Sequence, residues 1–191
     1  MLGAMEKVPR HEFIPPEHRK YAYDDMPLPI GSDQTISAPS MVAVMCQILE
    51  VEDGMKVLEV GTGMGYHAAI LSVLAGSGKV YTVERLPELA DRARETLKRN
   101  GFDSVEVILS DGSEGYPREA PYDRISVAAA APEVPEPLVE QLKDGGKLIL
   151  PVGRYEQDLV LVEKVNGKVR TSNKGGVMFV PLLGKHGFKG R

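Results

Sequence analysis

The chain contains only one cysteine, no basic cluster and no apolar run near the ~20 residues that a membrane-spanning helix needs. The single thiol, Cys46, excludes an intramolecular disulfide and a cysteine-rich zinc site. A net charge of −4 argues against nucleic acid as the main partner. No His, Cys and carboxylate residues have metal-ligand spacing, so we expect no metal. The first ten residues lack the apolar core of a signal peptide, and we expect a cytoplasmic protein with no membrane partner.

Alternating strands and helices make up most of the 191 residues. This alternation predicts a doubly wound α/β fold, Rossmann-like, whose mostly parallel sheet is covered on both faces. The length fits one domain with a sizeable core. We expect strands at residues 56–60, 80–84, 105–109, 122–127 and 147–151, with helices at 41–49, 66–74, 87–99 and 134–142.

The two ends of the chain depart from this alternation. Residues 1–27 are polar and proline-punctuated, which predicts short helices and loops. Ser37 or Ser40 is the expected N-cap of the helix that follows, with Pro39 in its first turn. An Asn166-Gly167 hairpin signal lies between two expected antiparallel edge strands, near residues 159–165 and 177–182. We therefore divide the single domain into a lid and substrate segment (1–50), a cofactor-binding core (51–153) and C-terminal edge strands (154–191).

The stretch from Lys56 to Gly65 is the strongest functional signal in the sequence. It reads as a buried strand followed by a glycine-rich turn, and a helix begins at Tyr66. Free N–H groups at a helix start, reached across glycines, are typical of a nucleotide-cofactor site. Glu84 ends the next strand, where an acidic residue accepts hydrogen bonds from ribose hydroxyls. Asp111-Gly112 follows the third strand, in a position suited to an adenine amino group.

The spacing of the glycines separates two cofactors. A dinucleotide fingerprint needs a further glycine at position 66, and this chain has Tyr66 there. The spacing Glu59-x-Gly61-x-Gly63-x-Gly65 is instead that of the first methyltransferase motif. The sequence therefore favours S-adenosyl-L-methionine, and an NAD-linked oxidoreductase stays the less favoured alternative.

The segment after the fourth core strand bears on the methyl acceptor. It reads Ala128-Ala129-Ala130-Ala131-Pro132, which offers no side chain to hold an amine and no general base. A carboxylate acceptor needs neither, because it is already ionised near pH 7. Alignment of its oxygen with the methyl group, in a pocket poor in water, then suffices. The segment permits a carboxylate acceptor without proving one.

Several stretches together resemble the protein-L-isoaspartate O-methyltransferase family, and the likeness runs nearly end to end. Among the members of this family, the sequence is most similar to archaeal or bacterial ones. The stretches are Val8-Pro9-Arg10-His11-Glu12-Phe13, Pro27-Leu28-Pro29-Ile30-Gly31, Gln34-Thr35-Ile36-Ser37-Ala38-Pro39, Leu58-Glu59-Val60-Gly61-Thr62-Gly63, Ala129-Ala130-Ala131-Pro132 and Phe179-Val180-Pro181-Leu182.

The resemblance implies a class I methyltransferase that repairs damaged proteins. We separately expect a monomer. Members transfer a methyl group from S-adenosylmethionine to the α-carboxyl of L-isoaspartyl residues, and the ester then closes to a succinimide. Ser37 matches the family's active-site serine and would orient the acceptor carboxylate, and the strand containing Val180 would contact the substrate. The expected cofactor-binding residues are Thr35, Ile36, Glu59, Gly61, Thr62, Gly63, Gly65, Glu84, Asp111 and Gly112.

In one further alternative, the protein binds the cofactor but catalyses methyl transfer weakly or not at all. The chain starts late, since family members usually carry another helix ahead of the segment that begins at Val8. Many members also have histidine or an aromatic residue where this chain has Ser40. A catalytically weak regulatory protein that binds S-adenosylmethionine would fit these two departures.

Overall fold

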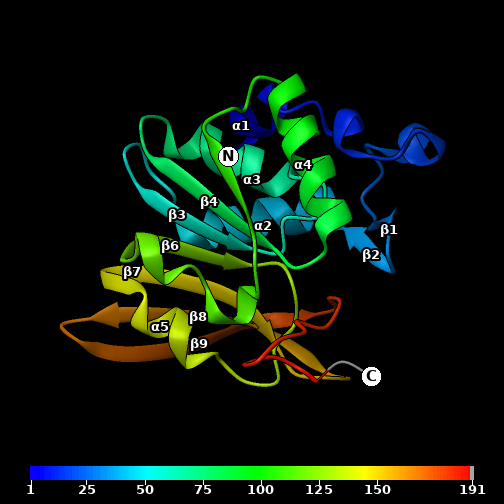
Figure 1. Cartoon of the computed structure of the whole chain (residues 1–191). Coiled ribbons are helices and arrows are strands. Elements are labelled where there is room, and N and C mark those ends of the chain that lie inside the picture. Colours follow the sequence, from blue (N-terminus) through cyan, green and yellow to red (C-terminus); the bar gives the residue numbers. More distant parts are fainter. Residues whose placement is uncertain (190–191) are drawn as a thin grey trace.

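A seven-stranded sheet runs through the centre of the molecule (Figure 1). The computed structural model describes residues 1–189. In spatial order the strands are β5-β4-β3-β6-β7-β8-β9. Their bounds are β3 Lys56–Val60, β4 Lys79–Glu84, β5 Val105–Leu109, β6 Tyr122–Val127, β7 Leu142–Val152, β8 Gln157–Val165 and β9 Lys168–Val177.

The sheet is parallel from β5 through β7 and antiparallel from β7 to β9. Strand β3 lies between β4 and β6, so the chain moves outward on one side of β3 and then returns to its other side. Ligands of open α/β sheets bind at such a switch point, beyond the carboxyl ends of the strands. The expected fold class, with antiparallel strands at the C-terminal edge, is confirmed.

The helices cover the two faces of the sheet unequally. Helices α1 to α4 pack on one face, where α3 contributes a nearly continuous buried surface. The other face is covered by the short α5, by single turns and by the C-terminal segment (Figure 1). The helix bounds are α1 Leu2–Lys7, α2 Pro39–Leu49, α3 Tyr66–Ala75, α4 Pro87–Arg99 and α5 Glu136–Glu140, with 3-10 turns at Arg10–Phe13, Pro16–Tyr21, Gly112–Glu114 and Pro117–Glu119.

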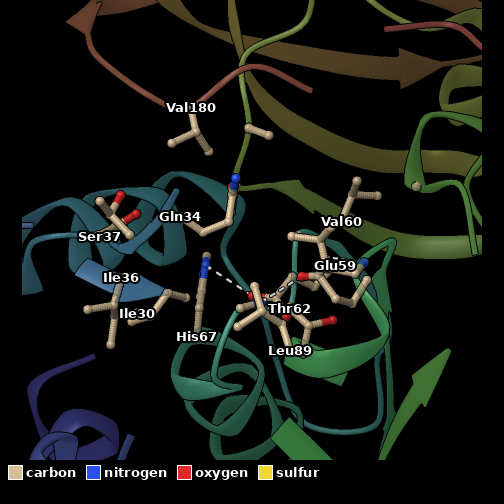
Figure 2. A pocket seen from close by; sticks show the side chains of 18 of the residues that line it. Ile30, Gln34, Ile36, Ser37, Glu59, Val60, Thr62, His67, Leu89 and Val180 are labelled. Carbon is tan, nitrogen blue, oxygen red and sulfur yellow. Dashed lines mark hydrogen bonds and ion pairs between the residues drawn. The ribbon is translucent and has the colours of Figure 1, made fainter. Parts of the chain in front are cut away.

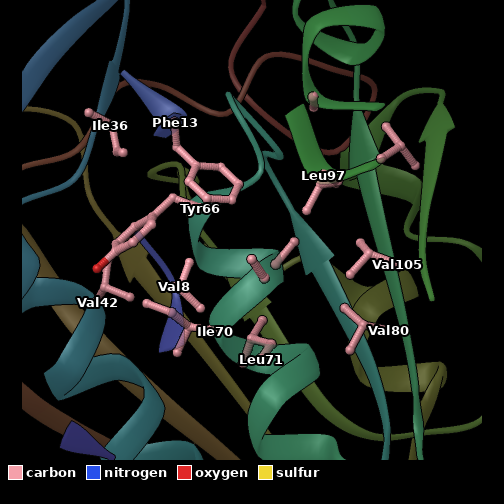
Figure 3. Packing of buried hydrophobic residues seen from close by; sticks show 14 of the residues in the cluster. Val8, Phe13, Ile36, Val42, Tyr66, Ile70, Leu71, Val80, Leu97 and Val105 are labelled. Atoms are coloured by element: carbon pink, nitrogen blue, oxygen red, sulfur yellow. The ribbon is translucent and has the colours of Figure 1, made fainter. Parts of the chain in front are cut away.

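Alternating side chains of β3 and of β4 enter two separate hydrophobic clusters, one on each face of the sheet. Val57 of β3 packs toward α3, whereas its neighbour Leu58 packs on the opposite face. Both are fully buried, as expected for a strand covered on both sides. Phe13, from the N-terminal segment, meets the ring of Tyr66 edge-on with centroids 5.8 Å apart (Figure 3). The N-terminal segment is thereby part of the same core as the helix after the glycine turn.

The last hairpin lies in a different place from the one expected. Asn166-Gly167 does form its turn, with positive φ at both residues, and β8 lies where expected. The second strand is β9 at 168–177, however, and the prediction of a strand at 177–182 is wrong. Strand β9 is largely exposed and polar, so it lacks the apolar alternation that marks a half-buried strand. Residues 180–182 instead pair with Ala130 of the core.

The edges of the predicted core elements also shift. The helix expected at 134–142 shrinks to α5, because β7 begins at Leu142 and extends five residues ahead of the expected start at 147. Strands β3, β5 and β6 and helix α4 have the expected bounds.

A small hairpin stands apart from the main sheet (Figure 1). It is formed by β1, Leu28–Gly31, and β2, Gln34–Ile36, and its turn residues Ser32 and Asp33 have φ of 52° and 56°. The sequence does not predict it, because this mirror-image turn is built without the glycine that usually marks one. The hairpin leads directly into Ser37.

A side chain from a distant segment caps the start of α2. Pro39 is in the first turn, as expected, but the residue at the cap position is Ala38. The free amide of Ser40 donates to the carboxylate of Asp25 at 2.9 Å. The prediction that Ser37 or Ser40 caps the helix is therefore wrong, and the hydroxyl of Ser37 is not used for capping.

Candidate active site

The glycine turn between β3 and α3 bends through backbone conformations that favour glycine. Gly61, Gly63 and Gly65 have φ of 94°, 55° and 90°. The turn is held to the end of β4, because the amide of Gly63 donates to Glu84 Oε2 at 3.0 Å. The other oxygen of Glu84 accepts from the amides of Arg85 and Leu86. The carboxylate of Glu84 is thus fixed at the rim of the sheet, where the sequence predicts the ribose contact.

A cavity of about 920 Å³, including its open mouth, lies beyond the carboxyl ends of β3, β4 and β6. Its walls come from the glycine turn, the β1–β2 hairpin, the start of α4 and the segment after β9. Ten expected site residues line it: Thr35, Ile36, Ser37, Glu59, Gly61, Thr62, Gly63, Glu84, Gly112 and Val180.

Glu59 and His67 form a buried pair at one side of this cavity (Figure 2). Glu59 Oε1 lies 3.5 Å from His67 Nδ1 and makes no hydrogen bond within residues 1–189. Glu59 Oε2 accepts a hydrogen bond from the Thr82 hydroxyl, which also contacts the hydroxyl of Thr62. On the other side of the imidazole, Nε2 lies 3.3 Å from the thiol of Cys46. Motif residue Glu59 is thus connected to the glycine turn through two threonines.

Burial governs the protonation of this pair. It raises the pKa of the Glu59 carboxyl to about 8, against an opposing hydrogen bond from Thr82, and the nearby Glu84 carboxylate raises it further. Burial also lowers the pKa of His67 to about 4. Near neutral pH both side chains are therefore uncharged in the free protein. A cationic ligand would shift Glu59 toward its ionised form, because a positive charge close to a carboxyl lowers its pKa.

Ser37 lies where the main cavity meets a second, smaller one. The second cavity, of about 400 Å³, shares Thr35, Ser37, Ala128 and Val180 with the first. Its other walls are largely apolar, and Met178 at its edge is 87% exposed. In Figure 2 Ser37 and Val180 come from opposite walls, one beside the β1–β2 hairpin and one after β9. The predicted acceptor-orienting residue is thus reached from both cavities.

Two expected cofactor residues lie away from the cavity wall. Gly65 is buried, and a Cβ there would come within 3.0 Å of Leu97 Cγ, so its lack of a side chain lets α3 pack against α4. Asp111 also lies outside the lining, although its neighbour Gly112 is part of it. A direct contact of either residue with the cofactor stays a prediction.

The carboxylate of Asp111 binds the C-terminal segment. Its Oδ1 accepts from the amide and hydroxyl of Ser113, and Oδ2 accepts from the amide of Lys185 at 2.8 Å. These hydrogen bonds outweigh desolvation and hold the pKa of Asp111 below its ordinary value. The amide of His186 adds a hydrogen bond to Ser113 Oγ. Because Leu182 and Leu183 line the cavity, these bonds hold a segment that forms part of its wall.

Several lining residues are not identified from the sequence. His67 follows the glycine turn and reads equally well as a solvated residue, whereas it is only 8% exposed. Of the others, Met64 and Tyr66 lie in or next to the glycine turn, and most of the rest come from segments that are distant in the sequence. The others include Ile30, Gln34, Met64, Tyr66, Leu86, Leu89 and Leu183.

No group of three or more His, Cys, Asp or Glu side chains within residues 1–189 is placed to hold a metal ion. The same residues contain no helix with the length and apolar character needed to cross a bilayer.

The residues around the cavity fit S-adenosylmethionine. The glycine turn exposes backbone to a ligand, and the two carboxyl groups of Glu59 and Glu84 suit one with positive charge and ribose hydroxyls. A doubly wound sheet with this motif at its switch point defines the class of Rossmann-like methyltransferases.

Comparison with known proteins gives the family. Residues 1–187 match the model of the family described as protein-L-isoaspartate(D-aspartate) O-methyltransferase (PCMT). The chain belongs to this family, so the resemblance noted in the sequence is confirmed. The protein-L-isoaspartate O-methyltransferase of Methanocella arvoryzae is 68% identical over 97% of this chain and 100% of its own. Protein-L-isoaspartate O-methyltransferase 2 of Archaeoglobus fulgidus is 58% identical over 97% and 86%.

Two solved structures of similar proteins have the same fold as this chain. A structure named protein-L-isoaspartate O-methyltransferase superposes with a TM-score of 0.88 at 32% identity, covering 97% of this chain and 61% of that one. A putative Plasmodium falciparum member, in complex with S-adenosyl-L-homocysteine, gives a TM-score of 0.86 at 29% identity and covers 95% and 88%. That complex contains the demethylated form of the expected cofactor.

Proposed function

We propose that this chain transfers the methyl group of S-adenosylmethionine to the α-carboxylate of L-isoaspartyl residues in damaged proteins and peptides. The observation that carries the proposal is the position of Ser37 at the junction of two cavities, one bounded by the glycine turn and the other edged by the exposed Met178. Membership of the family supports the same reaction. The two alternatives, a catalytically inactive binding protein and an NAD-linked oxidoreductase, receive no support from the comparisons.

The donor site is formed by the glycine turn and its surroundings. Bound S-adenosylmethionine supplies a methyl group made electrophilic by a sulfonium. Glu84 accepts hydrogen bonds from the ribose, and the backbone of Gly61 and Gly63 lets the ligand lie close to the sheet. Thr35 and Ile36 cover it from the side of the hairpin. Burial by apolar side chains excludes water, which favours a reaction between a cation and an anion that lose their charges together.

The acceptor site is the second cavity. The hydroxyl of Ser37 donates a hydrogen bond to one oxygen of the acceptor carboxylate and directs the other toward the methyl group. No base is needed, since a carboxylate carries no proton near pH 7. Val180 and the apolar wall around it contact the substrate chain. Alignment of the two reactants is the main contribution of the protein to the rate.

A paired-peptide assay tests the proposal. Two synthetic peptides of one sequence, one with L-isoaspartate and one with aspartate, are incubated with the chain and methyl-labelled cofactor. We expect label in the isoaspartyl peptide only. Equal labelling of both peptides, or of neither, would contradict the proposal. Cofactor binding by calorimetry without any turnover would favour the regulatory alternative instead.

The proposal also includes a monomeric, cytoplasmic enzyme that acts on proteins without a nucleic-acid partner. The net charge of −4 supports the last part, because it gives no general attraction to phosphates. Light scattering after size-exclusion chromatography tests the monomer, and fractionation of source cells tests the location. A mobility-shift assay with duplex and single-stranded DNA and RNA tests the absence of nucleic-acid binding.

A further inference from the structure

Arg10 is a buried cation that the chemistry described so far does not use. It is 1% exposed, its guanidinium contacts backbone and an aromatic ring, and the Asp25 carboxylate is near enough to favour its charge. Nε donates to the carbonyl of Ala22 at 2.8 Å, and Nη2 donates to the carbonyl of Ser37 at 2.8 Å. Cζ lies 4.8 Å from the centroid of the Tyr66 ring. Within residues 1–189, Nη1 has no hydrogen-bond partner.

These contacts join three segments that are distant in sequence. Ala22 ends the N-terminal 3-10 turn, Ser37 links the hairpin to α2, and Tyr66 is the first residue of α3. Tyr66 follows the glycine turn and lines the cofactor cavity. One guanidinium therefore contacts both the acceptor serine and the start of the cofactor helix.

A purely structural role explains this arrangement poorly. Burying a charge away from water is costly, and an apolar side chain of similar volume usually packs a core at least as well. Here the cation is held by two carbonyl oxygens and a ring. Burial lowers its pKa, and the nearby Tyr66 and Asp25 side chains offset this only in part. What an apolar side chain could not supply is the directed hydrogen bond to the Ser37 carbonyl.

The backbone of Ser37 depends on that bond more than its neighbours do. Ile36 is fixed by pairing with Leu28 across the hairpin, and α2 is fixed from residue 39 by its own hydrogen bonds and by Asp25. Ser37 lies between these two elements, and its hydroxyl takes no part in capping α2. Fixing its carbonyl restrains the backbone of Ser37, and this restricts the positions that its Cβ and hydroxyl can take.

We propose that Arg10 is a positioning residue that fixes the backbone of Ser37 relative to the cofactor helix, and so aligns the acceptor carboxylate with the methyl donor. The inference rests on the proposed function. It assigns to the N-terminal segment a part in acceptor alignment, in addition to its packing against α3.

The test compares Arg10→Lys and Arg10→Gln with wild type. For each variant we measure kcat and KM for an isoaspartyl peptide, the affinity for S-adenosylhomocysteine by calorimetry, and the thermal unfolding midpoint. We expect kcat/KM for the peptide to fall about tenfold or more, the size expected when one charged hydrogen bond is lost. The affinity for S-adenosylhomocysteine should change less than about threefold, because the glycine turn and Glu84 are untouched.

Arg19→Lys is the matched control. Arg19 belongs to the same N-terminal segment and also points a side chain at a carbonyl, that of Ile14 at 3.4 Å, but 43% of its side chain is exposed. It contacts neither cavity. We expect wild-type values for this variant in all three measurements.

Combining Arg10→Lys with Ser37→Ala separates positioning from general damage. If Arg10 acts through Ser37, its substitution should cost much less activity once the Ser37 hydroxyl is gone. Fully additive losses would overturn the inference. Equal losses of peptide turnover and cofactor affinity, or failure of both Arg10 variants to fold, would also overturn it, since each marks Arg10 as merely structural. Wild-type kinetics would overturn it too, because alignment would then not need Arg10. A wild-type protein that methylates no peptide would instead refute the proposed function.

Discussion

Glu59 Oε1 lies 3.5 Å from His67 Nδ1, and both side chains are uncharged near neutral pH because they are buried. An ionisable pair beside a ligand cavity makes both stability and binding depend on pH.

The stability of the free protein should fall as the pH rises from neutral toward 8. Above its ordinary pKa of 4.5, Glu59 ionises in the unfolded chain, whereas the folded protein keeps it protonated up to about pH 8. The folded state then binds more protons, so raising the pH favours unfolding. Between about pH 6.5 and about pH 8 the wild-type free energy of unfolding should fall by about 2 kcal/mol through Glu59, and Glu59→Gln should not show this fall.

Urea denaturation of wild type and Glu59→Gln at both pH values measures this effect. His67 does not interfere, because its lowered pKa costs stability only as the pH falls below its ordinary value of 6.5. Parallel pH dependence in the two proteins would show that Glu59 is already ionised in the fold.

Ser37→Ala should lower turnover while leaving the fold intact. Loss of a hydrogen bond to a charged acceptor corresponds to about a tenfold or larger drop in rate. Thermal stability should be unchanged, since Asp25 and not Ser37 caps α2. Ser40→Ala is the control, because it keeps the amide that Asp25 binds, and it should be active. Wild-type turnover of Ser37→Ala would refute the orienting role.

Gly63→Val should abolish cofactor binding. A Cβ at Gly63 lies 3.1 Å from the Ile30 side chain at the cavity wall, so valine would fill the space where a ligand meets the backbone. Gly101→Val controls for strain, because Gly101 also has a positive φ, of 79°, but has open space around its Cβ. Titration with S-adenosylhomocysteine should give no binding for the first variant and wild-type affinity for the second. Equal affinities would mean that the ligand binds elsewhere.

Asp111→Ala should release the C-terminal segment. The variant loses the acceptor of the Lys185 amide, so hydrogen exchange at residues 183–188 should become faster. Cofactor affinity should fall as well, since Leu182 and Leu183 line the cavity. Lys185→Met keeps that amide and removes only the exposed ion pair with Glu114, so exchange should stay slow. Unchanged exchange in Asp111→Ala would show that this carboxylate does not hold the segment.

Much of the fold is predictable from the sequence because its central elements carry strong local signals. Strands β3 and β5 are short, mostly apolar segments bounded by turns, and α4 has proline at its start and glycine just past its end. The glycine spacing and Glu84 likewise locate the cofactor site without reference to distant residues.

The parts that are not predictable depend on contacts between distant segments. Nothing near Ser40 indicates that Asp25 supplies the cap of α2, fifteen residues earlier. Asp111 has the sequence context of a ligand contact, yet its carboxylate binds the amide of Lys185, 74 residues away. Strand β9 is polar and lies at an exposed edge, so its sequence lacks the alternation of apolar and polar residues that marks a half-buried strand.

Competition between two peptides for one labelled methyl group tests the central claim most directly. An equimolar mixture of isoaspartyl and aspartyl peptides is incubated with trideuteromethyl S-adenosylmethionine, and tandem mass spectrometry locates the label. We predict that wild type places the label on the α-carboxyl of the isoaspartyl residue alone, at a rate that Ser37→Ala reduces. Label shared equally by both peptides, found on another group or absent from both would contradict the account.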